Sequence, residues 1–333
     1  MKTVLVTGGA GYVGSILIRR LLQRGDRVVC LDNLNFGGES LLDVWEHSHF
    51  HFHRCDITDT TDVDVILNQY QRIDAVVHLA AIVGDPACKR QPDLAYRTNW
   101  EASLYLLNQS VRLGISRFIF ASTCSNYGKM ADPGGFVDEG SPLSPVSLYA
   151  ELKVRFEQYM LHEMERPSGF CPTALRFATV YGLSPRMRFD LTVNEFTKEL
   201  ALGRELVVFG EQFWRPYCHV ADFSNAMLKV LDAAPESVAG EVFNVGDNDE
   251  NYTKGMLLDQ LLRRFPEARI RRMEMKDDPR DYRVRFDKIQ QRLGFAISRT
   301  VADGIGEMQR VLELGILSEP DHPHYYNIPH GAP

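Results

Sequence analysis

The fold class is decided by the stretch Thr7-Gly8-Gly9-Ala10-Gly11-Tyr12-Val13-Gly14, which follows a short apolar run at 3–7 and precedes an amphipathic segment. The hydrophobic period changes across it from that of a strand to that of a helix. Gly8, Gly11 and Gly14 have the spacing at which backbone can approach a diphosphate at a helix N-terminus, where amide donors and the helix dipole favour anions. Glycines also make ordinary tight turns, so the surrounding strand and helix carry the argument.

Short β-rich runs alternate with helical patterns through the first half of the chain, which predicts a parallel sheet covered on both faces. The β-rich runs are 3–7, 27–31, 74–79, 117–122 and 173–177, and the helical patterns cover about 12–23, 93–113 and 147–166. The second half is less regular, with helical patterns at 191–202, 223–232 and 253–265 and β-rich runs at 205–209 and 241–245.

We therefore predict an α/β protein with a Rossmann-type doubly wound parallel sheet and a smaller mixed α/β substrate-binding domain. The Rossmann domain is expected over residues 1–182, with a return segment over about 214–246. The smaller domain is expected over 183–213 and 247–318. Residues 319–333 contain four prolines and three histidines, and we expect an extended or frayed tail.

Composition excludes several classes of function. The 37 basic side chains are outnumbered by 44 acidic ones, for a net charge of −7, so the basic footprint of a nucleic-acid-binding protein is missing. No apolar run reaches membrane-spanning length, and the N-terminus lacks the layout of a signal peptide. The six cysteines include no Cys-x-x-Cys pair, which favours reduced thiols. We expect a cytoplasmic protein without nucleic-acid or membrane partners.

An acidic residue, Asp32, ends the second β-rich run. A carboxylate there can accept hydrogen bonds from the adenosine ribose hydroxyls and would repel a 2′-phosphate. The residues therefore favour NAD over NADP as cofactor. The alternative is an ordinary solvated carboxylate at the end of a strand.

Tyr149 and Lys153 are four residues apart, so both lie on one face of the predicted helix. A lysine ammonium near a phenol lowers the pKa of the phenol and makes it a usable acid and base. This spacing is common, and an exposed tyrosine beside a surface lysine is the alternative. The segment Ser122-Thr123-Cys124-Ser125-Asn126-Tyr127-Gly128 favours the catalytic interpretation, because it follows a strand at the edge where parallel sheets bind ligands.

Four histidines alternate with two phenylalanines between the β-rich runs at 27–31 and 74–79. On a strand, this period places the imidazoles on one face, which is compatible with either a metal site or a half-buried strand with its phenylalanines inward. No acidic or cysteine ligand shares the spacing, so we predict no metal. The residues are His47, His49, Phe50, His51, Phe52 and His53.

Together these motifs resemble the extended short-chain dehydrogenase/reductase family, particularly its NAD-dependent nucleotide-sugar epimerases and dehydratases of the UDP-glucose 4-epimerase-like type. The resemblance runs from Lys2 to about residue 310. Besides the stretches quoted above, it rests on L-D-N-L at 31–34, D-I-T-D at 56–59, H-L-A-A at 78–81, L-R-F-A-T-V-Y-G at 175–182 and W-R-P-Y-C-H-V-A-D at 214–222.

The resemblance implies a catalytic set in which Tyr149 is the acid/base, Lys153 holds the nicotinamide ribose and Thr123 bonds the reacting sugar hydroxyl or ketone. It also implies an NAD site in which Asp56 and Ile57 flank adenine and Asn99 has a structural role. The implied cofactor residues are Gly8, Gly11, Tyr12, Val13, Gly14, Asp32, Asn33, Asp56, Ile57, Leu79, Ala80, Ala81, Asn99, Ser122, Tyr149 and Lys153.

The residues after Thr123 bear on the type of reaction. Dehydratases that resemble this chain have Asp-Glu there, whereas this sequence has Cys124 and Ser125. An inert thiol at Cys124 is favoured over an acid/base. What remains is an epimerase that acts through a transient 4-keto sugar, or alternatively an NAD(P)H-dependent 4-ketosugar reductase. A dehydratase, or a dinucleotide sensor without catalysis, is ranked below both.

The resemblance also implies a nucleotide-diphosphate sugar as partner. Thr179 stands where the family commonly has an asparagine, and Arg186 and Arg188 follow it. Arginine suits diphosphate recognition because its planar fork binds phosphate oxygens in pairs. The implied substrate-binding residues are Cys124, Ser125, Thr179, Arg188, Arg215 and Arg280.

A homodimer is a further implication of the resemblance. The helices at about 93–113 and 147–166 correspond to those that form a four-helix dimer interface in the family. Their apolar residues fit either that interface or ordinary core packing. These residues are Leu104, Leu107, Val111, Phe156 and Met160.

Overall fold

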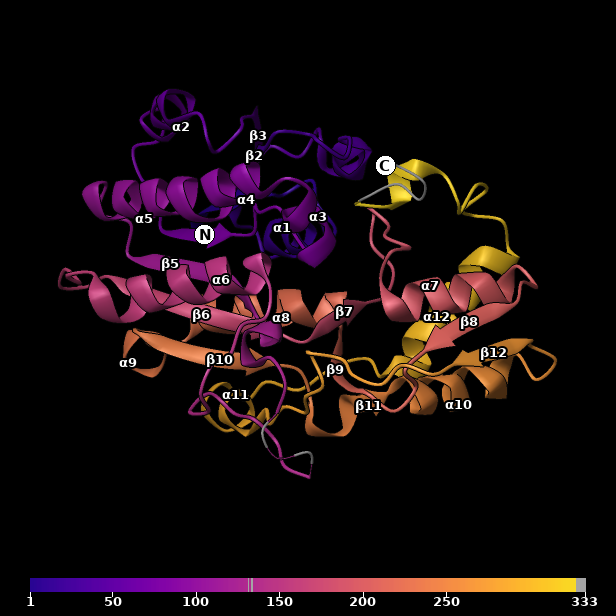
Figure 1. Ribbon diagram of the computed structural model, residues 1–333. Helices are drawn as coiled ribbons and strands as arrows, with labels where there is room; N and C mark the ends of the chain where they lie inside the picture. The colour runs from indigo at the N-terminus through magenta and orange to yellow at the C-terminus, as the bar shows by residue number, and fades with distance from the viewer. Residues whose placement is uncertain (131, 133, 328–333) are drawn as a thin grey trace.

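The computed structural model describes residues 1–130, 132 and 134–327 (Figure 1). Its main feature is a seven-stranded sheet in the order β10-β6-β5-β4-β1-β2-β3, in which every neighbouring pair is parallel. The predicted Rossmann-type sheet is therefore confirmed. The strands are β1 (Thr3–Thr7), β2 (Arg27–Asp32), β3 (Phe50–Arg54), β4 (Ala75–His78), β5 (Arg117–Thr123), β6 (Cys171–Phe177) and β10 (Glu241–Val245).

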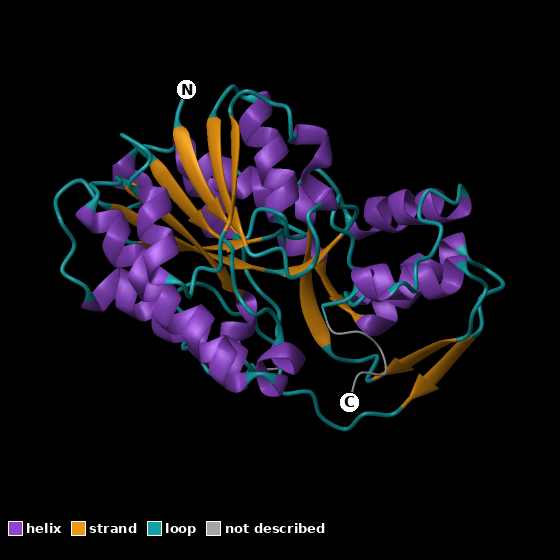
Figure 2. Cartoon of the chain, turned by 90° about the horizontal axis from the view of Figure 1, so that it is seen from above, coloured by secondary structure: helices purple, strands orange, loops and turns teal. Residues whose placement is uncertain are grey.

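Helices cover both faces of this sheet (Figure 2). The period-two alternation of β1 shows why, since Val4 and Val6 belong to one apolar core and Leu5 to the other. The first core is closed by α1 (Gly14–Gln23) and α8 (Val220–Asp232). The second is closed by α2 (Thr60–Leu67), α5 (Ser103–Arg112) and α6 (Leu148–Gln158).

Two predicted helices continue through wider turns. The predicted helix at 93–113 consists of α4 (Pro92–Tyr96), a π-helical segment at Arg97–Ala102 and α5. A second π-helical segment, Tyr159–Glu163, extends α6. Leu107, Phe156 and Met160 are buried in the second core, so the apolar stripe is explained by core packing. The homodimer stays a prediction.

A smaller lobe lies beside the carboxyl edge of the main sheet (Figure 1). It contains a three-stranded sheet in the order β11-β9-β7 and a parallel pair, β12 and β8. The elements are β7 (Thr179–Tyr181), β8 (Leu206–Phe209), β9 (Trp214–His219), β11 (Asn251–Thr253), β12 (Ile270–Met273), α7 (Thr192–Ala201), α10 (Lys254–Arg264) and α12 (Val301–Glu313).

The chain crosses between the lobes more often than we expected. We placed β7 and β9 in the Rossmann domain, but they pair with each other in the smaller sheet, so the return to the main sheet begins with α8. Phe286 and Ile289, at the start of α11 (Asp287–Leu293), pack in the core of the main sheet although we assigned them to the substrate domain. The domain bounds remain a prediction.

The short elements that remain complete the described chain. They are the 3-10 helices at Glu39–Val44, Cys124–Tyr127, Asn248–Glu250 and Pro323–Tyr325, and the helices α3 (Asp85–Arg90) and α9 (Pro235–Val238).

We expected an extended or frayed tail over residues 319–333, and its described part, as far as Asn327, is held against the smaller lobe. Phe189 N–H donates to the Tyr325 carbonyl at 2.9 Å, and the ring of Tyr326 is buried against Lys198, whose Nζ donates to its hydroxyl at 2.8 Å. A buried lysine and aromatic rings hold this segment on α7. The proline content of the segment gives no indication of these contacts. Residues 328–333 lie outside the described part.

The histidine run adopts the second of its two interpretations. Phe50 packs in the core, while His51 and His53 lie edge-on to the ring of Tyr70. Among the described residues, no three histidine, cysteine or acidic side chains are gathered as metal ligands. All six cysteines are buried and unbonded to one another. In the described chain no helix combines the length and apolar character needed to cross a membrane.

Candidate functional site

A cavity of about 450 Å³ lies at the carboxyl ends of the central strands, between the two lobes. This is the edge at which parallel sheets bind ligands, because helix N-termini and strand-end loops converge there. Most of the predicted site residues line it. They are Gly8, Gly11, Tyr12, Val13, Gly14, Asp32, Asn33, Asp56, Ile57, Leu79, Ala80, Ala81, Ser122, Thr123, Tyr149, Lys153 and Arg188.

The glycine-rich loop is shaped so that a ligand can approach its backbone. Gly8 has φ +72°, and a Cβ there would lie 2.7 Å from the Ala80 nitrogen. A Cβ on Gly14 would clash with the Gly8 carbonyl, so α1 can start this close to β1 only with glycine. Beside Gly11, only the Gly8 carbonyl lies close, which leaves the cavity side open. The loop thus fits a diphosphate at the N-terminus of α1.

Asp32 is held in a fixed orientation at the end of β2. Its two oxygens accept the Ala10 and Leu34 N–H groups, both at 2.9 Å. Burial raises the pKa of this carboxyl above its ordinary value, and the two backbone donors oppose that rise. Nearby, Asn33 donates to the Asp56 carboxylate at 3.1 Å. The arrangement offers carboxylate oxygens to a ribose.

Thr123, Tyr149 and Lys153 meet at the other end of the cavity. Thr123 ends β5, and Tyr149 and Lys153 lie in the first half of α6, whose N-cap Ser147 accepts the Ala150 N–H. The Lys153 ammonium donates to the Ala121 carbonyl at 2.7 Å and lies 5.9 Å from the centre of the Tyr149 ring.

The electrostatics of this group differ from our expectation. Burial raises the pKa of the Tyr149 phenol, and electrostatic interaction with Cys88 and Asp85 adds to that rise. Burial also lowers the pKa of Lys153 to about 8. Because the ammonium is bonded to the Ala121 carbonyl, the protein groups alone do not produce the lowered phenol pKa that the four-residue spacing predicted.

A buried polar network supports the catalytic end. Ser122 donates to Glu157 at 2.6 Å, and the Arg176 guanidinium donates to both Glu157 oxygens. Arg176 also donates to the Tyr127 hydroxyl at 2.9 Å. Glu157 follows Lys153 by one helical turn, so the network ties the catalytic face of α6 to the ends of β5 and β6. Sequence reasoning missed this pair because neither residue belongs to the catalytic spacing.

Several predicted residues do not line the cavity. Cys124 is buried beneath it, its thiol donates to the Arg176 carbonyl at 3.2 Å, and burial raises its pKa. In the structure the thiol is therefore a core group, and its predicted substrate contact stays a prediction. Asn99 is also buried, where its amide bonds both the N–H and the carbonyl of Ile82, so it holds the loop that follows β4.

The remaining predicted substrate residues are also absent from the lining. Arg215 pairs with Asp278 at 2.7 Å, and Arg280 pairs with Asp85 at 3.1 Å. Carboxylates of the protein thus pair with both guanidinium groups that we assigned to a diphosphate, although Arg280 stays 42% exposed. The motif positions do not reveal these pairs. Ser125 contacts the Tyr282 hydroxyl at 3.5 Å, and Thr179 pairs with Tyr217 between β7 and β9.

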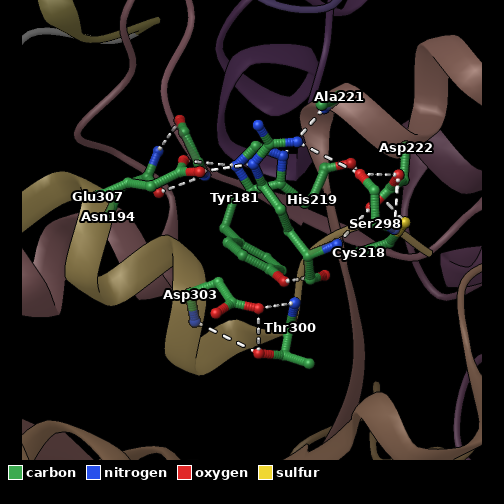
Figure 3. Close-up of polar contacts among 12 residues, drawn as sticks. Tyr181, Asn194, Cys218, His219, Ala221, Asp222, Ser298, Thr300, Asp303 and Glu307 are labelled. Atoms are coloured by element: carbon green, nitrogen blue, oxygen red, sulfur yellow. Dashed lines mark hydrogen bonds and ion pairs between the residues drawn. The ribbon is translucent and has the colours of Figure 1, made fainter.

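A second polar cluster joins α8 of the main lobe to α12 of the smaller lobe (Figure 3). His219 caps α8 by accepting the Ala221 N–H, and its other ring nitrogen donates to Glu307 on α12 at 3.2 Å. Asp222 accepts both the N–H and the hydroxyl of Ser298. The motif at 214–222 therefore fastens α8 to the segment before α12, a structural role for its last residues.

Some cavity residues were not predicted. Phe36, Gln91, Leu94, Thr98 and Asn327 belong to loops and short helices without a motif. Arg186 also lines the cavity, although it is not among the substrate-binding residues that the resemblance implies. Its position two residues before Arg188 is the one sequence signal that was available.

Comparison with known proteins places this site in a family. The profile of the NAD dependent epimerase/dehydratase family matches residues 4–246. A UDP-glucose 4-epimerase of Erwinia amylovora is 30% identical over 285 residues, covering 80% of this chain and 82% of its own. A dTDP-glucose 4,6-dehydratase of Streptomyces niveus is 31% identical over 316 residues, covering 91% and 90%.

Solved structures agree with this placement. The UDP-glucose 4-epimerase of Thermotoga maritima, determined with UDP-glucose, has a TM-score of 0.82 at 28% identity and covers 94% of this chain and 99% of its own. The UDP-glucose 4-epimerase of Thermus thermophilus, determined with NAD, has a TM-score of 0.79 at 26% identity, covering 92% and 98%. The chain belongs to the NAD-dependent epimerase/dehydratase family and is an enzyme of the extended short-chain dehydrogenase/reductase type.

Proposed function

We propose that this enzyme is a nucleotide-sugar epimerase that acts through a transient 4-keto sugar. The observation that carries the proposal is the meeting of Thr123, Tyr149 and Lys153 in one cavity with the glycine-rich loop. The UDP-glucose 4-epimerases among its relatives support the same choice.

The charges around the cavity favour epimerisation over elimination of water. Among the described lining residues, the acidic side chains are Asp32 and Asp56, and both lie at the end predicted for adenosine. Asp85 acts electrostatically on Tyr149, but its carboxylate accepts the Ser147 hydroxyl and pairs with Arg280. A dehydratase needs an acid and a base beside the sugar, and the two positions after Thr123 hold Cys124 and Ser125 instead.

The proposed roles follow from the residues that line the catalytic end. NAD⁺, when bound, accepts a hydride from the sugar and returns it. Tyr149 takes the proton from the sugar hydroxyl and gives it back to the ketone oxygen, while Thr123 orients that oxygen with its own hydroxyl. Lys153 holds the nicotinamide ribose. Rotation of the ketone before its reduction inverts the carbon.

Cofactor retention separates this proposal from the ketoreductase alternative. We expect the purified enzyme to carry NAD and to interconvert a UDP- or TDP-hexose with its C4 epimer without added cofactor. The measurement is chromatography of nucleotide released by heat, followed by NMR of the sugars after incubation. Protein that arrives without NAD and consumes NADH in proportion to product would support the ketosugar reductase and refute the epimerase.

Asp32→Ala is expected to weaken NAD⁺ binding by on the order of 10- to 100-fold, because charge-assisted hydrogen bonds to the ribose are lost. Calorimetric titration of nucleotide-free protein measures the change, and Asp43→Ala, which removes an exposed carboxylate paired with Arg19, is the control. Affinity for UDP should stay within a few-fold of the parent. Equal losses for both nucleotides would show that Asp32 does not contact the ribose.

A further inference from the structure

The Arg186 side chain is a buried cation that the protein itself does not satisfy. The residue is 3% exposed, and within the described structure two of its guanidinium nitrogens, Nε and Nη2, have no hydrogen-bond partner. Burial and the neighbouring Arg188 lower its pKa to about 10, so it remains charged at neutral pH. A charge buried without a partner is costly, which indicates that an anion completes the site.

The other cations of the cavity are already engaged. Arg188 forms a two-pronged pair with Asp190, at 2.9 and 2.8 Å, and Lys153 donates to the Ala121 carbonyl. Of the two arginines that line the cavity, Arg186 is therefore the one whose guanidinium donors are left for a ligand.

Arg186 reaches the cofactor half of the cavity from the smaller lobe. Its guanidinium carbon lies 4.4 Å from the centre of the Phe36 ring, in the loop after β2. Tyr12 of the glycine-rich loop and Asp32 are among the groups that act electrostatically on it. Arg188 acts on Tyr149 as well as on Tyr12, so it lies between the two ends of the cavity.

The loop that carries Arg186 is fixed to the glycine-rich loop. Ser184 donates to the Tyr12 carbonyl at 2.7 Å, and the Tyr12 hydroxyl donates to the Gly182 carbonyl. Asn194 on α7 donates to the Arg188 carbonyl at 2.8 Å and to the Tyr12 hydroxyl at 3.1 Å. This side of the smaller lobe therefore stays beside the N-terminus of α1, where a diphosphate would lie.

We propose that Arg186 is a cofactor-positioning residue that binds the NAD diphosphate from the smaller lobe, opposite the glycine-rich loop. The diphosphate is then held by backbone amides on one side and by a guanidinium on the other. The two contacts come from different lobes. Release of the cofactor therefore requires either that the lobes separate or that the bond between Arg186 and the diphosphate breaks first. The proposal depends on NAD binding and not on whether the sugar is epimerised.

The test compares nucleotides with and without phosphate on nucleotide-free enzyme. Arg186→Met is expected to weaken ADP and NAD⁺ by on the order of 10- to 100-fold while leaving adenosine affinity unchanged. Arg186→Lys should recover part of the loss. Arg272→Met, which removes a half-exposed arginine paired with Glu211, should behave as the parent. Equal losses for adenosine and ADP, or no loss for either, would overturn the assignment, as would a loss confined to UDP.

Thermal unfolding gives an independent readout. Without nucleotide, Arg186→Met should unfold at the same or a higher temperature than the parent, because an unsatisfied buried charge is gone. With saturating NAD⁺, it should gain less stabilisation than the parent. An arginine with only a structural role would lower the unfolding temperature in both conditions. If nucleotide-free enzyme cannot be prepared, the NAD content of each purified variant replaces the titration: less NAD in Arg186→Met supports the proposal, and parental content refutes it.

Discussion

Tyr149→Phe is expected to lower turnover by about 10²- to 10⁴-fold, the usual contribution of a positioned general acid/base. The substitution removes one hydroxyl from a partly buried ring and leaves Thr123, Lys153 and the glycine-rich loop in place. Binding of NAD⁺ should therefore change little. Single-turnover measurement of NADH absorbance after sugar nucleotide is added isolates the oxidation step, and calorimetry measures the cofactor.

The matched control is Tyr70→Phe, which removes a tyrosine hydroxyl bonded at 2.7 Å to His53 on the edge strand β3 of the main sheet. That variant should turn over at the parental rate. Near-parental turnover in Tyr149→Phe would remove this residue from the mechanism. Loss of NAD⁺ binding together with turnover would instead indicate that the ring supports the cofactor site.

The raised pKa of the Tyr149 phenol also bears on how turnover depends on pH. In the structure burial raises the pKa of Tyr149, so the phenol stays protonated at neutral pH unless a cation lies close to its oxygen. Burial lowers the pKa of Lys153 to about 8, so this cavity residue is charged at neutral pH and loses its charge as the pH rises through about 8. We expect turnover to respond to Lys153→Met as well, which distinguishes a working pair from two neighbours on a helix.

The sheet and the cofactor end of the cavity could be predicted because they depend on local rules. A strand, a glycine-rich turn and a helix place Gly8, Gly11 and Gly14, and the strand-end position places Asp32, without any long-range information. The same logic placed Tyr149 and Lys153 on one face of α6. Each of these residues lines the cavity.

The substrate end could not be predicted in the same way, because long-range ion pairing decides which arginines face the cavity. Arg215 and Arg280 carry the same charge as Arg186, yet Asp278 and Asp85 hold them in internal pairs. Such partners lie 63 and 195 residues away along the chain. The contacts of the tail could not be predicted for a similar reason, since the hydrogen bond between Lys198 and Tyr326 joins segments that no local pattern connects.

The pair of Glu157 and Arg176 shows how much such a long-range contact contributes to stability. Both side chains are almost fully buried, at 3% and 5% exposure. Burial opposes the charge of Arg176, but the attraction of Glu157 and the hydrogen bonds to it outweigh that cost, so the pKa of Arg176 is raised above its ordinary value. Removal of one partner leaves the other charge buried without compensation.

Glu157→Ala is therefore expected to lower the free energy of unfolding by about 3–5 kcal/mol, measured by urea denaturation. Glu241→Ala is the matched control, because this carboxylate also has two cationic partners, Lys288 and Arg292, but is 29% exposed, and its loss should cost about 1 kcal/mol or less. Replacing both members of the buried pair, as Glu157→Leu with Arg176→Met, should recover much of the lost stability, since no uncompensated charge remains. If Glu157→Ala were no more costly than Glu241→Ala, burial would not govern this network, and its role beneath Ser122 would have to be assigned to packing alone.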